Sequence, residues 1–461
     1  MEFAGKATKL QIFTSGFPFL NFKTPQMRAF WITAFAFFMC FFSWFGIVPF
    51  MPQVVKDLGL TPQQKYMSII VAVSGTVFAR LLLGKLCDRF GPRLCYTWLL
   101  LIGAIPVIAI AFVQNYTQFL ICRLFIGFIG ASFVITQYHT SIMFAPNCVG
   151  TANATSAGWG NLGGGANRIG MMAISSFIVS IGLCDAASSW RWSMAIAGII
   201  CALTALIYFF FTQDAPEGNF KDLRAAGKMP EPKKAEAGFM AAAKDYRVWI
   251  LFLVYAGCFG IELTVYGVMD DYLQNAFSIE RSTAMTMVAC FALMNIFART
   301  LGGVFGDKFG IKNGLKGRVQ FLTIIMCIEG IVLCLFSQIS LFPLAFAVLI
   351  LFSLSVQMAE GATFTVVPFI NKKCIGSVAG IVGAGGNVGA VLAGLLIKSN
   401  VGAAKGAAES AAVSNSFLII GAIVILSGIL SLLIKFSPEA EAEVREATLS
   451  SAGKKATEAT A

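Results

Sequence analysis

The sequence predicts an all-α membrane protein that crosses the bilayer many times. Of its 461 residues, 57% are hydrophobic and only 12% are charged, and the mean hydropathy is +0.78. A soluble domain carries about 25% charged residues, so this composition excludes a large water-soluble enzyme and a disordered or fibrous chain. Two further observations support the prediction: apolar runs of membrane-helix length recur along the chain, and two motifs each occur once in either half.

A membrane helix needs about 20 mostly apolar residues, and about twelve such runs follow one another along the chain. They lie near 30–50, 67–85, 94–113, 119–140, 153–182, 192–212, 248–269, 283–306, 319–336, 342–370, 375–398 and 414–435. The first run is too long for the apolar part of a signal peptide, and no small-residue cleavage site follows it. We therefore expect it to remain as a helix.

The longest polar stretch, 213–247, separates the sixth run from the seventh, and its Pro, Gly and mixed charges are typical of a linker. The sequence thus predicts one six-helix bundle at 30–212 and a second at 248–436. We expect the segments at 1–29 and 437–461 to be tails. The second tail is polar and of low complexity, which predicts disorder.

Basic residues are distributed unevenly between alternate loops. If the N-terminus is cytoplasmic, the segments on that side carry 24 Lys and Arg, and those on the other side carry six. The positive-inside rule then places both termini in the cytoplasm. Because the net charge of +11 is spread over short loops, it does not indicate nucleic-acid binding. Four arginines lie within or at the ends of apolar runs: Arg80, Arg123, Arg168 and Arg299.

The residue types that enzymes and metal sites need are scarce. The twelve cysteines are scattered without a CxxC pair, and His139 is the only histidine. We therefore expect no enzyme activity, no cofactor and no metal site. A sensor would need a signalling domain, for which the linker and tail are too short, and a channel would need a ring of pore charges. We expect a monomer embedded in the lipid bilayer.

Two motifs are repeated in the same order in the two halves. Residues 80–91 read RLLLGKLCDRFG and residues 299–310 read RTLGGVFGDKFG, at an offset of 219. Residues 158–164 read GWGNLGG and residues 383–390 read GAGGNVGA, and the Asn161 and Asn387 within them are 226 residues apart. This order indicates a duplication, and internal repeats with a substrate site near the bilayer midplane are typical of secondary transporters.

The first repeated motif resembles the cytoplasmic loop signature of the major facilitator superfamily. It falls between the second and third helices and again between the eighth and ninth, as that family requires. Its residues here are Gly84, Asp88, Arg89, Gly91 and Arg93 in the first half, and Gly303, Asp307 and Lys308 in the second. Small glycines allow close helix approach and each Asp can pair with a base or cap a helix. The motif is compatible both with a latch of the transport gate and with a structural clasp.

Arg80 and Arg299 each stand eight residues before the Asp of the loop motif. That separation is about 12 Å along a helix, which puts both side chains near the midplane of a core about 30 Å thick. A charge there costs several kcal/mol and normally faces a cavity or a partner. We therefore expect the two cations to converge on an anionic substrate, for which a planar guanidinium suits a flat oxyanion. The alternative is that each pairs with an acid of another helix, namely Glu262, Glu329 or Glu360.

The Gly-rich stretches lie inside long apolar runs and do not fit a phosphate-binding loop. We expect their glycines to serve helix packing and movement; these are Gly158, Gly160, Gly163, Gly164, Gly383, Gly385, Gly386 and Gly389. Packing does not explain an asparagine at the matching place in both halves. Since an amide can donate hydrogen bonds to an anion, we expect Asn161 and Asn387 to face the substrate.

Paired GN signatures in helices five and eleven, with paired arginines in helices two and eight, resemble the nitrate/nitrite porter family of the major facilitator superfamily. The stretch YAGCFGIELT at 255–264 is most similar to its high-affinity nitrate uptake branch. The resemblance implies a major facilitator fold of 12 transmembrane helices in two pseudo-symmetric bundles. It also implies that nitrate or nitrite binds at Arg80, Arg299, Asn161, Asn387, Tyr255, Phe259 and Phe133. His139 departs from the branch, which usually has an aromatic residue there.

Importing one anion against a potential of 100 mV costs about 2.3 kcal/mol, so uptake needs a driving ion or exchange. Glu262 lies seven residues after Tyr255 on the same helical face and is our candidate for proton coupling, with Glu329, Glu360 and His139 as rivals. We therefore expect nitrate import with proton symport across the plasma membrane, or the inner membrane in a bacterium. Nitrate/nitrite exchange and transport of another small oxyanion are the alternatives.

Overall fold

The computed structural model describes residues 4–12, 20–229, 235–402, 406–451 and 453. Within these residues the regular elements are helices, and β-structure is limited to two isolated bridges. The all-α prediction is therefore confirmed. Parts of the predicted tails and linker (1–3, 13–19, 230–234, 452 and 454–461) lie outside the described residues. The chain forms two compact units.

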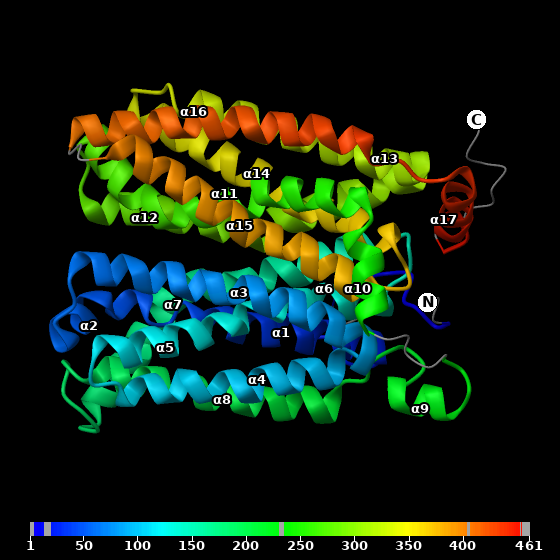
Figure 1. Cartoon of the computed structure of the whole chain (residues 1–461), viewed down its shortest axis with the longest axis horizontal. Coiled ribbons are helices and arrows are strands. Elements are labelled where there is room, and N and C mark those ends of the chain that lie inside the picture. The colour runs from blue at the N-terminus through cyan, green and yellow to red at the C-terminus, as the bar shows by residue number, and fades with distance from the viewer. Residues whose placement is uncertain (1–3, 13–19, 230–234, 403–405, 452, 454–461) are drawn as a thin grey trace. The chain divides into compact units, whose positions relative to one another are not determined.

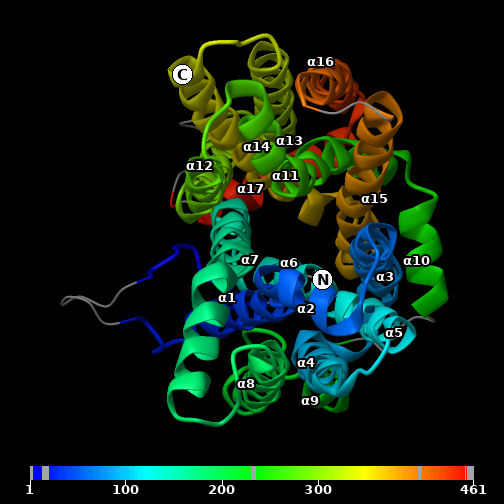
Figure 2. The same cartoon turned by 90° about the vertical axis from the view of Figure 1, so that its left-hand side faces the viewer.

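The N-terminal unit comprises the described residues of Met1–Lys6, Gln11–Met143 and Trp159–Phe239. Its helices are α1 Pro25–Trp44, η1 Val48–Phe50, α2 Met51–Leu58, α3 Pro62–Phe90, α4 Pro92–Ala109, η2 Ile110–Phe112, α5 Tyr116–Gly127, η3 Phe128–Ala131, α6 Ser132–Met143, most of α7 Val149–Ser180, α8 Ser189–Phe211, α9 Phe220–Ala225 and the start of α10 Ala235–Ala243. Helix α4 packs on α8, and α3 packs on α5, as the end-on view in Figure 2 shows.

The C-terminal unit comprises the described residues of Ala7–Leu10, Phe144–Gly158 and Met240–Ala461. Its helices, besides the ends of α7 and α10 that belong to it, are α11 Tyr246–Phe277, α12 Arg281–Leu293, η4 Met294–Ile296, α13 Ala298–Phe336, α14 Phe342–Ile370, α15 Ile375–Val401, α16 Ala407–Leu430, η5 Ser431–Leu433 and α17 Pro438–Ser451. Helix α13 packs on α14 and α16, and α11 packs on α15 (Figure 1).

Ten helical segments among the described residues are long and apolar enough to cross a membrane. One of them, Thr283–Phe336, contains two of the predicted runs, because α13 within it consists of two helices that meet at a kink, where Asn313 and Gly314 have non-helical backbone angles. Gly314 has a φ of +66°, which a residue with a side chain adopts only with strain. The run at 153–182 lies in α7 but is not among the ten, because Gly, Asn and Arg residues lower its hydropathy.

Local sequence explains where several helices begin. Thr24 caps α1 by accepting from the N–H of Met27, and Thr61 and Gln64 form a capping box at the start of α3. The outward faces keep large apolar side chains exposed, for example Phe78 at 71% and Ile169 at 79%. In a membrane protein such faces contact lipid.

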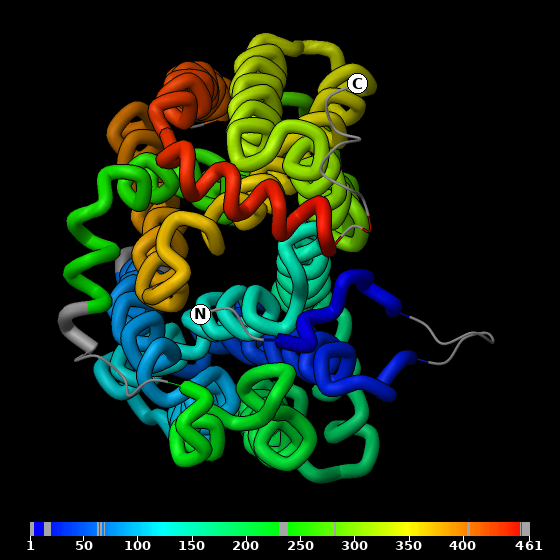
Figure 3. The backbone as a smooth tube through the Cα atoms, turned by 90° about the vertical axis from the view of Figure 1, so that its right-hand side faces the viewer, coloured from blue at the N-terminus to red at the C-terminus, as the bar shows by residue number. Residues whose placement is uncertain are grey.

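The C-terminal tail differs from its prediction. Residues Pro438–Ser451 form helix α17, which packs on α13 with Val444 and Leu449 buried. Figure 3 shows α17 in red lying across helix ends of its unit. Lys372 forms an ion pair with Glu443 of α17 at 2.9 Å. The prediction of disorder for 437–451 is thus wrong, because tertiary contacts stabilise a segment whose composition alone is typical of a disordered end.

Candidate functional site

Arg299 lies in α13 and is 1% exposed. Its guanidinium forms an ion pair with Glu360 of α14 through Nη1, and its Nη2 donates to the hydroxyl of Tyr255 at 2.9 Å. The alternative considered for this arginine, a carboxylate on another helix, is therefore realised within the C-terminal unit. The Glu360 carboxylate and the Tyr255 hydroxyl therefore already accept from the two Nη groups of the planar guanidinium that an oxyanion would use.

Tyr255 and Phe259 stand one turn apart on α11 and stack with ring centroids 5.2 Å apart and an interplanar angle of 10°. Phe364 packs edge-on against Tyr255 at 5.2 Å. Gly386 of α15 lies directly against the pair, because a Cβ added there would come within 2.4 Å of Phe259. The predicted aromatic pair thus forms a flat apolar surface, and its tyrosine hydroxyl touches Arg299.

Glu262 is 1% exposed and lies near Arg299 in the same unit. Its Oε1 accepts hydrogen bonds from Asn295 Nδ2 at 2.7 Å and from the Tyr266 hydroxyl at 3.0 Å. Asn295 was not predicted as a site residue. Asn295 lies in η4, four residues before Arg299. In the continuous helix that the sequence predicts, this spacing gives the same face, so it could have identified Asn295.

The two predicted asparagines differ in burial. Asn387 on α15 is fully buried, and neither atom of its amide has a hydrogen-bond partner among the described residues. Asn161 on α7 is partly exposed, and its Oδ1 is buried without such a partner. Leaving a buried polar group unsatisfied costs about 1–3 kcal/mol. An incoming anion could accept a hydrogen bond from the Asn387 amide and recover part of that energy.

In the N-terminal unit, Arg80 on α3 is fully buried. Its Nε and Nη2 make long hydrogen bonds of 3.4 Å to the carbonyl oxygen of Gly130. The guanidinium carbon lies 5.2 Å from the ring centroid of Phe133, which is also buried. The structure therefore brings together Arg80 and Phe133, two residues that the sequence placed in the substrate site.

Several motif glycines lie where a Cβ would collide with a neighbouring helix. An added Cβ would meet the carbonyl oxygen of Phe38 at Gly163, of Phe252 at Gly385 and of Ala256 at Gly389, all at 2.4 Å or less. Similar close approaches occur at Gly158, Gly160, Gly303 and Gly386. Gly164 has only an ordinary contact of 3.4 Å. Gly84 and Gly383 are buried, within α3 and α15 respectively. Small residues permit these helix contacts in a membrane.

The loop motif of the second half is built around Asp307, which is 3% exposed. Its carboxylate accepts from the N–H groups of Gly150 and Thr151 at the start of α7 and from Thr151 Oγ1. Arg318 pairs with it at 2.6 Å and also donates to the Pro146 carbonyl oxygen. The basic-residue count treated Arg318 as a topology signal, whereas its side chain is buried at 1% exposure. Lys308 is exposed, with its ammonium 5.5 Å from the Phe305 ring.

The loop motif of the first half contacts a different acid. Asp214, which follows α8, accepts from the N–H of Arg93 at 2.8 Å and from the N–H of Phe220 at 3.0 Å. Burial raises the pKa of Asp214 to about 6, while these hydrogen bonds oppose the shift. Gly91 has a φ of +87°, and a Cβ there would lie 2.5 Å from the Asp214 carboxylate. Asp214 was missed because nothing in the sequence ties it to this loop.

The other two motif residues of the first half, Asp88 and Arg89, lie at the end of α3 and are more exposed. The Arg89 carbonyl oxygen accepts from Arg224 at 2.8 Å. The linker residues that follow α8 thus contact the first loop motif at two places.

His139 on α6 is fully buried in a hydrogen-bonded cluster. Its Nε2 lies 2.9 Å from the Gln213 carbonyl oxygen, which can only accept, so Nε2 carries the proton. Nδ1 then accepts from the Tyr208 hydroxyl at 2.6 Å, and Thr33 lies beside both groups. These contacts favour the packed, structural role for His139 over a proton-coupling role.

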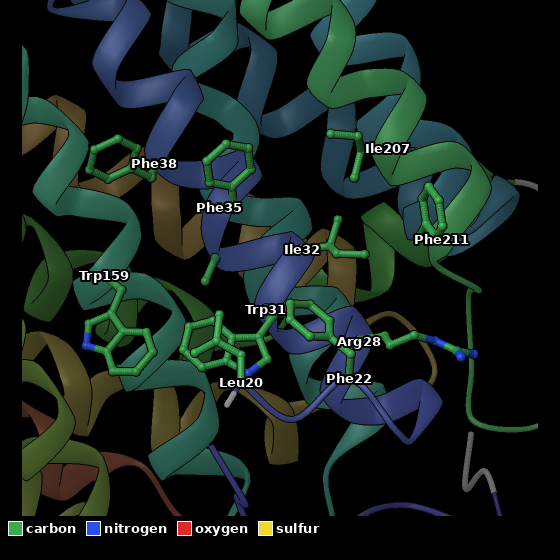
Figure 4. Close-up of a pocket in the computed structure, with 11 residues that line it drawn as sticks. Leu20, Phe22, Arg28, Trp31, Ile32, Phe35, Phe38, Trp159, Ile207 and Phe211 are labelled. Atoms are coloured by element: carbon green, nitrogen blue, oxygen red, sulfur yellow. The ribbon is translucent and has the colours of Figure 1, made fainter. Parts of the chain in front are cut away.

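Two apolar pockets lie away from the candidate residues. The pocket in Figure 4, about 580 Å³, belongs to the N-terminal unit and is lined by residues of α1, α7 and α8 and by Leu20 and Phe22, which precede α1. The rings of Trp31 and Trp159 lie side by side in it, with their centroids 5.2 Å apart, and Arg28 extends away from the rings. A second pocket of about 760 Å³ lies among α3, α4 and α5. None of the predicted substrate-binding residues lines either pocket.

Comparison with known proteins decides the family. Residues 33–368 match the model of the Major Facilitator Superfamily. The chain is 39% identical to "High affinity nitrate transporter 2.5" of Arabidopsis thaliana, over 85% of this chain and 76% of that protein. It is 30% identical to "Nitrate/nitrite transporter NrtP" of a Picosynechococcus strain, over 84% of this chain and 88% of that protein. The chain belongs to the nitrate/nitrite transporter family of the major facilitator superfamily.

Solved structures of the superfamily share its fold. The proton:xylose symporter XylE superposes with a TM-score of 0.65 at 13% identity, over 88% of this chain and 95% of that one. The human organic anion transporter MFSD10 gives a TM-score of 0.63 at 13% identity, over 87% of this chain and all of that one. The predicted family and fold class are confirmed. The protein is a multi-pass membrane transporter rather than an enzyme.

Proposed function

We propose that this transporter imports nitrate, with nitrite as a second substrate, across the plasma membrane. The proposal depends on one observation: the arginines at matching positions of the repeat, Arg80 and Arg299, are 0% and 1% exposed inside helices of a membrane transporter. Its relatives are named as nitrate and nitrate/nitrite transporters. Each half supplies one guanidinium to the anion, and alternating access exposes that anion to one side of the membrane at a time.

The remaining predicted residues have chemistry that suits a small flat anion. Tyr255, Phe259 and Phe133 supply apolar ring faces and one hydroxyl beside the guanidinium groups, which lowers the local dielectric and strengthens charge interactions. Asn387 offers a buried amide without a partner among the described residues, and Asn161 occupies the matching position of the repeat. The excess of basic residues in alternate loops supports a cytoplasmic location for both termini.

Proton symport is the proposed driving reaction. Import of one anion against 100 mV costs about 2.3 kcal/mol, and one proton carried with it removes that electrical cost. Glu262 and the carboxyl groups beside it are the acids of the C-terminal unit that lie close to Arg299. The latch role of the two loop motifs belongs to the same proposal: Asp307 binds the start of α7, so release of that contact can accompany movement.

Uptake by purified protein in proteoliposomes tests this function. Nitrate, nitrite and formate are offered with and without an inward proton gradient, and we expect nitrate accumulation that the gradient drives. Acceleration by internal nitrite without a gradient would instead indicate exchange. Arg80→Lys and Arg299→Lys should abolish uptake while the protein still elutes as a folded species, and Arg445→Lys on α17 is the matched control. Normal nitrate transport by either of the first two variants would refute the site assignment.

A further inference from the structure

The surroundings of Arg299 contain more carboxyl groups than one guanidinium can neutralise. Three buried acids lie in this region, each 1% exposed or less: Glu262 on α11, Glu329 on α13 and Glu360 on α14. Glu360 lies close enough to the other two for electrostatic interaction. Of these three, Glu360 forms the ion pair with Arg299. An ionised carboxylate without a partner in the membrane interior is strongly unfavourable, so the charge of Glu360 depends on its contact with Arg299.

The hydrogen bonds around the two nearest acids show what holds each of them. Asn295 and Tyr266 donate to Glu262 Oε1, whereas Glu360 Oε2 is held by Arg299. Glu262 Oε2 and Glu360 Oε1 are buried without a hydrogen-bond partner among the described residues. An anion that takes Arg299 away from Glu360 therefore removes the contact that stabilises the Glu360 charge.

The other titratable groups that face Glu360 come from two helices. From α11 they are Tyr255, Cys258 and Glu262, and from α13 they are Arg299 and Glu329. Neither carboxyl oxygen of Glu329 has a hydrogen-bond partner among the described residues, which fits a neutral acid. In the ion pair of Arg299 and Glu360 the two charges cancel.

We propose that Glu360 takes up the proton that travels with the anion, an inference that rests on the proposed function. An oxygen of the anion replaces the Glu360 carboxylate on Arg299 Nη1, so the ion pair breaks and a new one forms between Arg299 and the anion. Glu360, which has lost its cation and now lies beside an anion, binds one proton from solution. One anion and one proton have entered, and the net charge of the cluster is unchanged. On release, the anion leaves, Glu360 gives up its proton and the original ion pair forms again.

Proton uptake by Glu360 determines how the affinity for nitrate depends on pH. If one proton binds with each anion, the dissociation constant for nitrate rises about tenfold per pH unit wherever Glu360 is ionised in the free protein. Nitrate affinity of the purified wild-type protein is measured calorimetrically across a pH series. In Glu360→Gln, which carries a permanently neutral side chain, nitrate should still bind and the pH dependence should disappear.

Two matched variants separate Glu360 from its neighbours. Glu262→Gln should keep the tenfold dependence, because Glu360 and its contact with Arg299 remain. Glu446→Gln, an exposed residue of α17, should behave as wild type. In proteoliposomes, Glu360→Gln should exchange internal for external nitrate within a few-fold of the wild-type rate but should not accumulate nitrate from a proton gradient.

The results of these experiments separate the proton assignment to Glu360 from the proposed transport of nitrate. A wild-type affinity that does not change with pH overturns the proton assignment while leaving nitrate transport intact, and it can be read even if Glu360→Gln fails to fold. Loss of the pH dependence in Glu262→Gln with its retention in Glu360→Gln assigns the proton to Glu262 instead. Absence of nitrate binding by the wild-type protein at every pH overturns the proposed function as well.

Discussion

Asp307 offers a direct test of how a buried ion pair stabilises the C-terminal unit. Its two oxygens accept four hydrogen bonds: from Gly150 N at 3.1 Å, Thr151 N at 2.6 Å, Thr151 Oγ1 at 2.8 Å and Arg318 Nη1 at 2.6 Å. In Asp307→Asn one oxygen becomes an amide nitrogen, which points a donor at other donors. The substitution also removes the negative charge that Arg318 and the start of α7 both contact.

The expected loss of stability follows from these contacts. Removing one partner of a buried ion pair typically costs about 3–5 kcal/mol. Arg318 keeps the carbonyl oxygens of Pro146 and Thr365 as acceptors, so we expect the lower end, about 3 kcal/mol. For a unit of this size, each kcal/mol corresponds to about 2–4 °C in the midpoint of thermal unfolding. Asp307→Asn should therefore unfold about 6–12 °C below the wild type.

A double-mutant cycle checks the physical reason as well as the size. Thermal unfolding in detergent is followed by tryptophan fluorescence for Asp307→Asn, Arg318→Met and the double variant. Because each single variant leaves the other partner buried alone, the double variant should lose clearly less than the sum of the two, by at least ~1 kcal/mol. A midpoint for Asp307→Asn within 2 °C of wild type, or strict additivity, would show that this ion pair does not stabilise the unit.

Two further predictions concern other parts of the molecule. Because burial raises the pKa of Asp214 to about 6 from an ordinary 3.8, the folded state holds its proton more tightly than the unfolded state. The free energy of unfolding should therefore fall by about 2 kcal/mol as the pH rises from 4 to 6. Asp214→Asn should remove this decrease, and an unchanged pH profile of the unfolding midpoint would contradict it. Gly386→Ala should displace Phe259, which lies 2.4 Å from the added Cβ, and weaken nitrate binding severalfold. Gly394→Ala on the same helix is the control, because its added Cβ has nothing within 4 Å and nitrate should bind normally. Equal nitrate affinities of the two variants, measured by calorimetry, would argue against a role for the aromatic pair.

The repeat allowed part of the candidate site to be predicted from sequence. The spacing of Arg299 from Asp307 predicted a position within a membrane-spanning segment, and the structure buries Arg299 there beside Tyr255. Asn295 could have been included by the same helical reasoning. Sequence spacing does not report which residues of other helices face a given side chain, so it does not distinguish among the three glutamates as the partner of Arg299.

Some features had no sequence signal at all. Arg318 looks like one more basic loop residue, and its burial beside Asp307 depends on the bend of α13 at Gly314. Residues 438–451 have a composition typical of disorder, yet they form α17 because Val444 and Leu449 have an apolar surface to pack on. Such surfaces arise only when distant segments assemble.

The sequence by itself determined that this protein is a helical membrane transporter and which family it belongs to. That information is local or additive: each apolar run must become a helix because lipid offers no hydrogen bonds to the backbone, and each repeated motif can be read without its neighbours. The tertiary structure alone decided that Glu360 forms the ion pair with Arg299. A buried carboxyl group is charged or neutral according to the groups within a few ångströms of it, and those groups come from three separate helices.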